Sequence, residues 1–109
     1  MPRYLIQASY TAEAAAAFVS KPQDRTEGLR AVMEKLGARM ESFDYALGEY
    51  DVHATYTAPD DTTAVAIALA VTAPGHLRAY KTTKLVSPEE FMEASRKASG
   101  AGYQAPSGA

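Results

Sequence analysis

Hydrophobic and polar side chains alternate along four segments of this chain, and a period of two is typical of β-strands. Residues 4–10 and 50–57 show the alternation most clearly, and residues 38–46 and 76–86 follow it less regularly. A short turn around Gly48 joins the second of these segments to the third. Strands joined this tightly pair antiparallel, so the pattern predicts a hairpin within a four-stranded sheet.

Apolar residues at three- and four-residue spacing predict helices between the strands and after the last one. The predicted helices cover residues 12–19, 20–36, 62–72 and 89–98. We expect the second to begin at a cap formed by Ser20 and to stop at Gly37, since glycine readily adopts a positive φ. The last has the strongest start signal, because Ser87, Pro88 and Glu90 match a capping box with proline at the first helical position.

The order of these elements predicts an α+β fold of the ferredoxin-like βαββαβ type with an extra C-terminal helix. We expect one domain over residues 1–99 and a flexible tail over residues 100–109, which are rich in Gly, Ala, Pro and Ser. In this fold the helices cover one face of the sheet. The other face has no cover within the chain, so we expect a homodimer in which two sheets face each other as a dimeric α+β barrel.

Alternation also predicts which side chains lie on the uncovered face. If Val52, Ala54 and Tyr56 face the helices, their neighbours on the same strand face away. The predicted uncovered set is Leu5, Gln7, Ser9, Phe43, Tyr45, Asp51, His53, Thr55, Thr57, Arg78, Tyr80 and Thr82. A face that is both aromatic and polar is typical of a dimer interface with a wet, ligand-sized interior. A bulge in any strand would turn part of this set to the other face.

Composition excludes several classes of function. A net charge of −2 over 109 residues, without a strongly basic segment, argues against nucleic acid as a partner. The absence of cysteine removes disulfides, thiolate catalysis and cysteine-based metal sites. We find no signal-peptide pattern and no apolar run long enough for a bilayer, so we expect a cytoplasmic protein without a membrane partner. Phosphate-binding loops and dinucleotide fingerprints are also absent.

Residues 48–51 read Gly48-Glu49-Tyr50-Asp51 and resemble the signature of the GYD family, small bacterial proteins named for a Gly-x-Tyr-Asp motif. Further landmarks of this resemblance are Tyr10-Thr11, Pro22 with Asp24-Arg25, Leu36-Gly37, Ala58-Pro59-Asp60-Asp61 and Gly75. The resemblance covers the chain from Tyr4 to about Ala98. It implies membership of the wider group of dimeric α+β barrels, which includes cofactor-free monooxygenases, isomerases, haem enzymes and ligand-sensing domains. It therefore implies a fold and an assembly, but no particular reaction.

Within the signature, Gly48 is expected to supply a turn with positive φ. Asp51 and His53 lie two apart on one strand, so their side chains share a face. An Asp can orient an imidazole that then moves protons near neutral pH, which makes this pair the candidate catalytic group. Two simpler interpretations stay open: Asp51 accepts backbone or Arg hydrogen bonds in a turn, and His53 is satisfied at a subunit interface.

A candidate ligand site surrounds this pair. Arg78 would hold a negative charge and Tyr80 would hydrogen-bond or stack, with Gln7 and Tyr50 beside them. Alternatively, Arg78 and Tyr80 lie on a solvent-exposed strand and bind no ligand. Arg25 is expected to tether the start of a helix and not to bind substrate.

A metal site is a weaker possibility. His76 with His53 and Asp51 would allow a two-His-one-carboxylate metal site, but nothing in the spacing requires one. We therefore expect neither metal nor cofactor.

Two functions are compatible with this pattern. One is a homodimer that binds a small molecule or a partner protein through a sheet-lined pocket. The other is a cofactor-independent isomerase, lyase or oxygenase that acts on a small aromatic or enolisable substrate through Asp51 and His53. A closed cavity touching His53, Arg78 and Tyr80 would favour the enzyme, and a shallow open face around His53 would favour binding.

Overall fold

The computed structural model describes residues 1–108, so Ala109, the last residue of the predicted tail, lies outside the described part. In chain order the elements are β1 (Arg3–Tyr10), α1 (Ala12–Ser20), α2 (Thr26–Lys35), β2 (Arg39–Tyr45), β3 (Val52–Thr57), α3 (Asp61–Thr72), β4 (Leu77–Leu85) and α4 (Pro88–Ser99). The strands form one antiparallel sheet in the order β2-β3-β1-β4. This order confirms the predicted α+β, ferredoxin-like fold with an added C-terminal helix.

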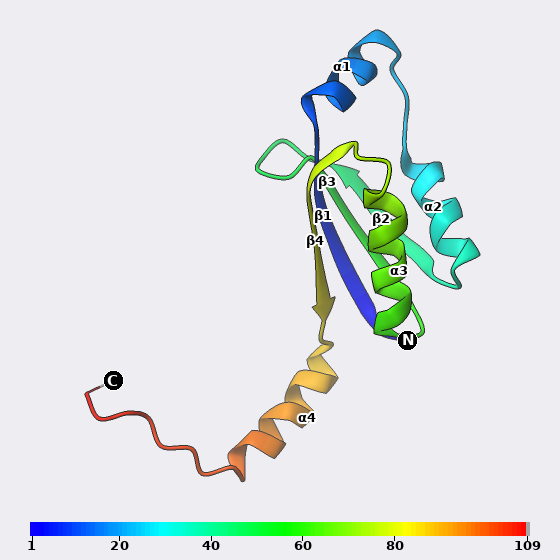
Figure 1. The fold of residues 1–109 in the computed structure, drawn as a ribbon. Coiled ribbons are helices and arrows are strands. Elements are labelled where there is room, and N and C mark those ends of the chain that lie inside the picture. The colour runs from blue at the N-terminus through cyan, green and yellow to red at the C-terminus, as the bar shows by residue number, and fades with distance from the viewer. Residues whose placement is uncertain (109) are drawn as a thin grey trace.

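Helices α2 and α3 lie side by side on one face of the sheet, as Figure 1 shows. The core fills the space between these helices and the sheet. Its fully buried side chains include Ile6 of β1, Met33 of α2, Tyr56 of β3 and Ile67 of α3. Helix α1 stands beyond the end of β1, and α4 leads away from the sheet (Figure 1); neither helix buries a side chain.

Local hydrogen bonds determine where the helices begin and end. Ser87 and Glu90 form the predicted capping box at the start of α4, and Gly37 ends α2 with a φ of 82°. The predicted start of α2 at Ser20 is wrong, because Ser20 is the last residue of α1. Instead, the Asp24 carboxylate accepts hydrogen bonds from the Thr26 amide and hydroxyl at 3.0 and 2.7 Å, and α2 begins there.

An extra residue in β2 changes which face its aromatic side chains occupy. The pairing with β3 shifts between Met40 and Ser42, so that Phe43 lies opposite Ala54. Since Ala54 is fully buried under the helices, Phe43 lies on the covered face, and so does Tyr45, two residues further along. Their predicted placement on the uncovered face is wrong, because a bulge reverses the alternation beyond it.

The pairing of β4 with β1 has a similar consequence. Tyr80 lies opposite Ala8, and Thr82 lies opposite Ile6, so both belong to the covered face and not to the predicted uncovered one. Arg78 falls at the irregularity near the start of β4 and is exposed. The uncovered face therefore keeps Gln7, His53 and Thr55 but loses Thr82 and the three aromatic residues.

None of the helices within residues 1–108 is both long and apolar enough to cross a bilayer.

Candidate functional site

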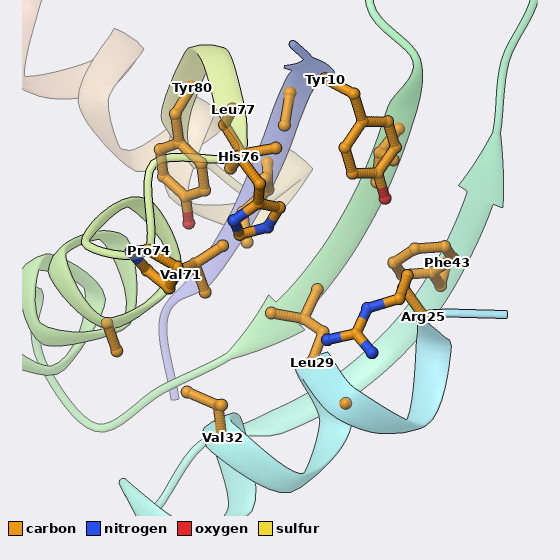
Figure 2. Close-up of a pocket in the computed structure, with 15 residues that line it drawn as sticks. Tyr10, Arg25, Leu29, Val32, Phe43, Val71, Pro74, His76, Leu77 and Tyr80 are labelled. Carbon is orange, nitrogen blue, oxygen red and sulfur yellow. The ribbon is translucent and has the colours of Figure 1, made fainter. Parts of the chain in front are cut away.

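A cavity of about 200 Å³ lies on the covered side of the sheet, between α2, α3 and the strands (Figure 2). Most of its wall is aliphatic or aromatic. Four polar side chains interrupt that wall: Tyr10, Arg25, His76 and Tyr80. No carboxylate lines the cavity in the described part of the chain, so its only permanent charge is positive.

Arg25 stands immediately before α2, and its position is held by its backbone. Its amide donates to the Tyr45 hydroxyl at 2.8 Å, and that hydroxyl donates to Asp24 at 3.0 Å. This network ties the start of α2 to β2, which agrees with the tethering role predicted for this residue. The guanidinium is separate from the network, and Figure 2 shows it directed into the cavity.

Gly28 makes room for the Arg25 side chain on the first turn of α2. A Cβ at this position would lie 3.2 Å from the Arg25 Nη2 atom and 3.4 Å from its Cζ. Glycine inside a helix costs about 1 kcal/mol relative to alanine, so its presence here indicates a close approach. Among the described residues, no carboxylate lies within ion-pair distance of this guanidinium, which leaves it available to an anion.

Tyr80 contributes a buried hydroxyl that lacks a hydrogen-bond partner within the described chain. Burial raises the pKa of Tyr80 to about 12, so the phenol is a neutral donor near pH 7. A buried hydroxyl without a partner costs about 1–3 kcal/mol relative to a satisfied one. The Tyr56 hydroxyl deeper in the core is also buried without a partner, but Tyr56 does not line the cavity.

Tyr10 and His76 close the end of the cavity near α1. The Tyr10 ring packs edge-on against Phe18, with centroids 4.8 Å apart, and lies 6.3 Å from the His76 ring. Burial raises the pKa of Tyr10 to about 12. The His76 carbonyl accepts the Thr11 amide at 3.0 Å, which fixes this residue just before β4, and Figure 2 shows its imidazole turned toward the cavity.

His53, the predicted catalytic base, lies on the opposite face of the sheet from Tyr80. Its neighbours across the strands are Asp44 on β2 and Gln7 on β1, and Gln7 in turn lies opposite Lys81. These four residues form a polar row on the uncovered face. The structure thus brings His53 and Gln7 together as predicted, but it does not bring either of them to Tyr80 or to the exposed Arg78.

Tyr50 packs beside His53 with ring centroids 6.4 Å apart and planes nearly perpendicular. Its signature neighbour Asp51 points elsewhere: the Asp51 Oδ2 atom accepts the Tyr10 amide at 2.9 Å. The Asp51 amide donates to the Ala8 carbonyl, and its carbonyl accepts the Ala46 amide, both at 2.8 Å. Asp51 therefore ties the β2–β3 loop to the end of β1. This matches its structural interpretation, as an acceptor of backbone hydrogen bonds, and not its catalytic one.

Gly48, the first residue of the signature, does not have the predicted positive φ; the prediction is wrong. The loop between β2 and β3 is long enough to turn without a left-handed residue, and a Cβ at Gly48 would meet no atom within 4 Å.

Sequence reasoning missed Arg25 and His76 as residues of the cavity wall. For Arg25 a signal existed, because a glycine three residues later within a helix often marks a close contact. For His76 no local signal exists, since its place depends on how the end of β4 meets α1. The possible site of His53, His76 and Asp51 is not formed, and residues 1–108 hold no cluster of three metal-ligating side chains.

Comparison with known proteins places the chain in a family. No protein with a curated description matches it. A solved structure titled "Crystal Structure of MtbAldR" is similar with a TM-score of 0.57 at 10% identity, over 79% of this chain and 52% of that one. Our chain thus spans about half the length of that protein, and the likeness shows the fold alone. The GYD domain model matches residues 4–95. Since that match covers most of the sequence, the protein belongs to the GYD domain family.

Proposed function

We propose that this protein is a homodimer that binds a small, mostly apolar molecule with one negatively charged group in the cavity between α2, α3 and the sheet. The observation that carries the ligand part is the pairing of an apolar wall with an Arg25 guanidinium that has no carboxylate partner among the described residues. Pockets of this composition, with a few polar groups that fix orientation, are typical of small-molecule sites.

The size of the cavity limits the ligand to one ring or a short branched chain. A cavity of about 150 Å³ accommodates benzene, and this one measures about 200 Å³. A ring with a carboxylate is therefore the largest class that fits without rearrangement. The carboxylate would form a charge-assisted pair with Arg25, and the neutral Tyr80 hydroxyl would donate to it or to a second polar atom.

Benzoate and its neutral counterpart benzamide are suitable probes for a titration followed by protein NMR or calorimetry. We expect benzoate to bind and benzamide to bind at least tenfold more weakly, because only the former can pair with Arg25. The variant Arg25→Gln should weaken benzoate binding by a similar factor. Arg30→Gln is the matched control, since Arg30 lies on α2, five residues after Arg25, and is already paired with Glu27. Equal affinity in both variants would contradict the proposal.

Tyr80→Phe gives a second test that separates a ligand role from a structural one. Removing a hydroxyl that has no partner in the described chain should leave the stability of the free protein unchanged or slightly higher. The same change should weaken benzoate binding. Tyr4→Phe is the control, because the Tyr4 hydroxyl donates to Asp61 at 2.6 Å and its loss should lower stability while leaving the affinity for benzoate as it is.

One observation favours the enzymatic alternative, a cofactor-independent isomerase, lyase or oxygenase. His76 lines the same cavity as Tyr10 and Tyr80, and an imidazole can transfer protons near neutral pH. If the protein is an enzyme, His76→Asn should abolish turnover of a bound enolisable acid while its affinity stays within a few-fold. If it is a binding protein, wild type and variant alike should leave the bound acid unchanged over hours.

A further inference from the structure

The entrance of the ligand cavity carries polar side chains, whereas its floor on the sheet is apolar. At the entrance Arg25 is exposed, and Tyr10 and His76 are half-buried. The floor includes the buried side chains of Ile6 and Val52. Since burying a charge without a partner is costly, a small aromatic acid would place its ring on this floor and its carboxylate at the entrance.

Tyr10 lies between Arg25 and His76 at this entrance. Its ring centroid is 6.3 Å from that of His76. Burial raises the pKa of Tyr10 to about 12, and the positive charge of Arg25 acts in the opposite direction, so the guanidinium lies near the phenol. In Figure 2 the Arg25 guanidinium, the His76 imidazole and the Tyr10 hydroxyl point toward the same part of the cavity. An anion paired with Arg25 would therefore lie close to His76.

The imidazole of His76 is not engaged by its own chain. The backbone of His76 is fixed, because its carbonyl accepts the Thr11 amide at 3.0 Å. Within residues 1–108, however, the ring has no hydrogen-bond partner and no carboxylate at ion-pair distance. A ring nitrogen that faces a cavity without such a partner is available to a ligand.

We infer that His76 is a second contact for the negative group of the ligand and binds it as an imidazolium, so that binding takes up a proton and strengthens as the pH falls. Histidine is the side chain that ordinarily changes its charge between pH 5 and pH 8. A nearby anion favours the charged ring, and by linkage the charged ring favours the anion. The inference rests on the ligand part of the proposed function and adds a regulation by pH to the same site.

The other ionisable groups around His76 would not produce this dependence. Burial raises the pKa values of Tyr10 and Tyr80 to about 12, and Arg25 keeps its charge at every pH used here. Helix α3 contributes only apolar side chains to the wall. The charged residues that lie nearby but outside the wall are Glu13 of α1, Asp24 before α2, Asp51 before β3 and Arg78 of β4. Carboxyl groups ordinarily titrate below about pH 5, which leaves His76.

Benzoate titrations at pH 5.5 and pH 8 in low salt give the first test, since benzoate is ionised at both values. We expect binding to be about tenfold tighter at pH 5.5, because the imidazolium adds an opposite charge a few ångströms from the carboxylate. His76→Gln should remove this difference by weakening binding at pH 5.5, and it should agree with wild type within a few-fold at pH 8.

Two controls accompany this titration. His53→Gln replaces the only other histidine of the chain, which lies on the opposite face of the sheet and pairs with Gln7. This variant should keep the full pH dependence. Benzamide, which carries no charge, should bind with the same low affinity at both pH values.

The second test uses the unmodified chain and so does not depend on how a variant folds. Calorimetry of benzoate binding at pH 7, in two buffers with different ionisation enthalpies, should show proton uptake. In NMR spectra at the same pH, benzoate should move the ring resonances of His76 toward their positions in the protonated form. The ring resonances of His53 are the internal control and should stay where they are.

The outcomes separate this inference from the proposed function. Absence of benzoate binding at both pH values would overturn the inference and the ligand part of the proposed function together. Equal affinity at both pH values, or a pH dependence that His76→Gln retains, would overturn the inference alone and leave Arg25 as the anion contact. A pH dependence lost in His53→Gln would also overturn it.

Discussion

On the covered face of the sheet, Tyr4 and Tyr56 stack with ring centroids 5.1 Å apart and are almost inaccessible to water. At the same end of the uncovered face, Arg3 forms an exposed ion pair with Glu41 at 3.0 Å. Adjacent residues of β1, Arg3 and Tyr4, thus belong to different environments. Interactions that need exclusion of water, such as one made by the buried Tyr80 hydroxyl, gain strength only on the covered side.

The same contrast changes where a partner would bind. The uncovered face was predicted to carry an aromatic surface on which a partner could pack. The side chains that would have formed it, Phe43, Tyr45 and Tyr80, lie on the covered face. What remains on the uncovered face is the polar row through His53 and Gln7. Exposed large apolar side chains are found instead on the helices, among them Leu69 of α3 and Phe91 of α4.

The largest effect should come from paired substitutions at adjacent positions of β1. Ile6→Ala on the covered face should lower the free energy of unfolding by about 2–5 kcal/mol, because it leaves a cavity at a site only 2% exposed. Gln7→Ala on the uncovered face should change it by less than about 0.5 kcal/mol. Urea denaturation measures both. A large loss for Gln7→Ala would show that this face is also buried, as in a sheet-to-sheet dimer.

Asp51 should show an intermediate effect, since its carboxylate accepts the Tyr10 amide at 2.9 Å. We expect Asp51→Asn to lower the free energy of unfolding by about 1–2 kcal/mol through loss of a charge-assisted hydrogen bond. Asp44→Asn, in the exposed row beside His53, is the control and should have almost no effect. Equal thermal melts for the two variants would remove the structural role that we assign to Asp51.

Acid should weaken the covered side through the start of α3, where Asp60 and Asp61 lie. Hydrogen bonds from Thr63 lower the pKa of Asp60, and those from Tyr4 and Lys84 lower the pKa of Asp61. A carboxyl group with a lower pKa in the folded state stabilises the fold above its unfolded pKa of about 3.9, and this contribution is lost as pH falls below that value. Urea midpoints between pH 7 and pH 3 should decline less steeply in Asp61→Asn than in wild type.

The smallest effect is expected at Gly48. Because its backbone is outside the left-handed region and a Cβ would meet nothing within 4 Å, Gly48→Val should change the free energy of unfolding by less than about 0.5 kcal/mol. The effect should thus be smaller than that of Asp51→Asn. The reverse order in a side-by-side thermal melt would mean that the loop is held more tightly than its open surroundings indicate.

Much of the local structure could be predicted from sequence because it depends on neighbours in the chain. The capping box at Ser87 and Glu90 and the stop at Gly37 need only residues within one helical turn. The start of α2 was predicted at Ser20 although its cap, Asp24 with Thr26, is equally local. What the sequence does not show is that the Tyr45 hydroxyl, 21 positions away, also holds Asp24. Likewise, the uncovered placement predicted for Tyr80 failed because strand register is a long-range property.

By itself, the sequence determined the family, the order of strands and helices, and the ferredoxin-like fold, since periodicity and turn residues act over short distances. Only the tertiary structure decided the candidate site. A bulge beside Glu41 and the register of β4 against β1 placed Phe43 and Tyr80 under the helices. Side-chain alternation has a period of two, so a shift by one residue moves a side chain across the sheet. That shift separated His53 from Tyr80 and brought Tyr80 to the cavity shared with Arg25.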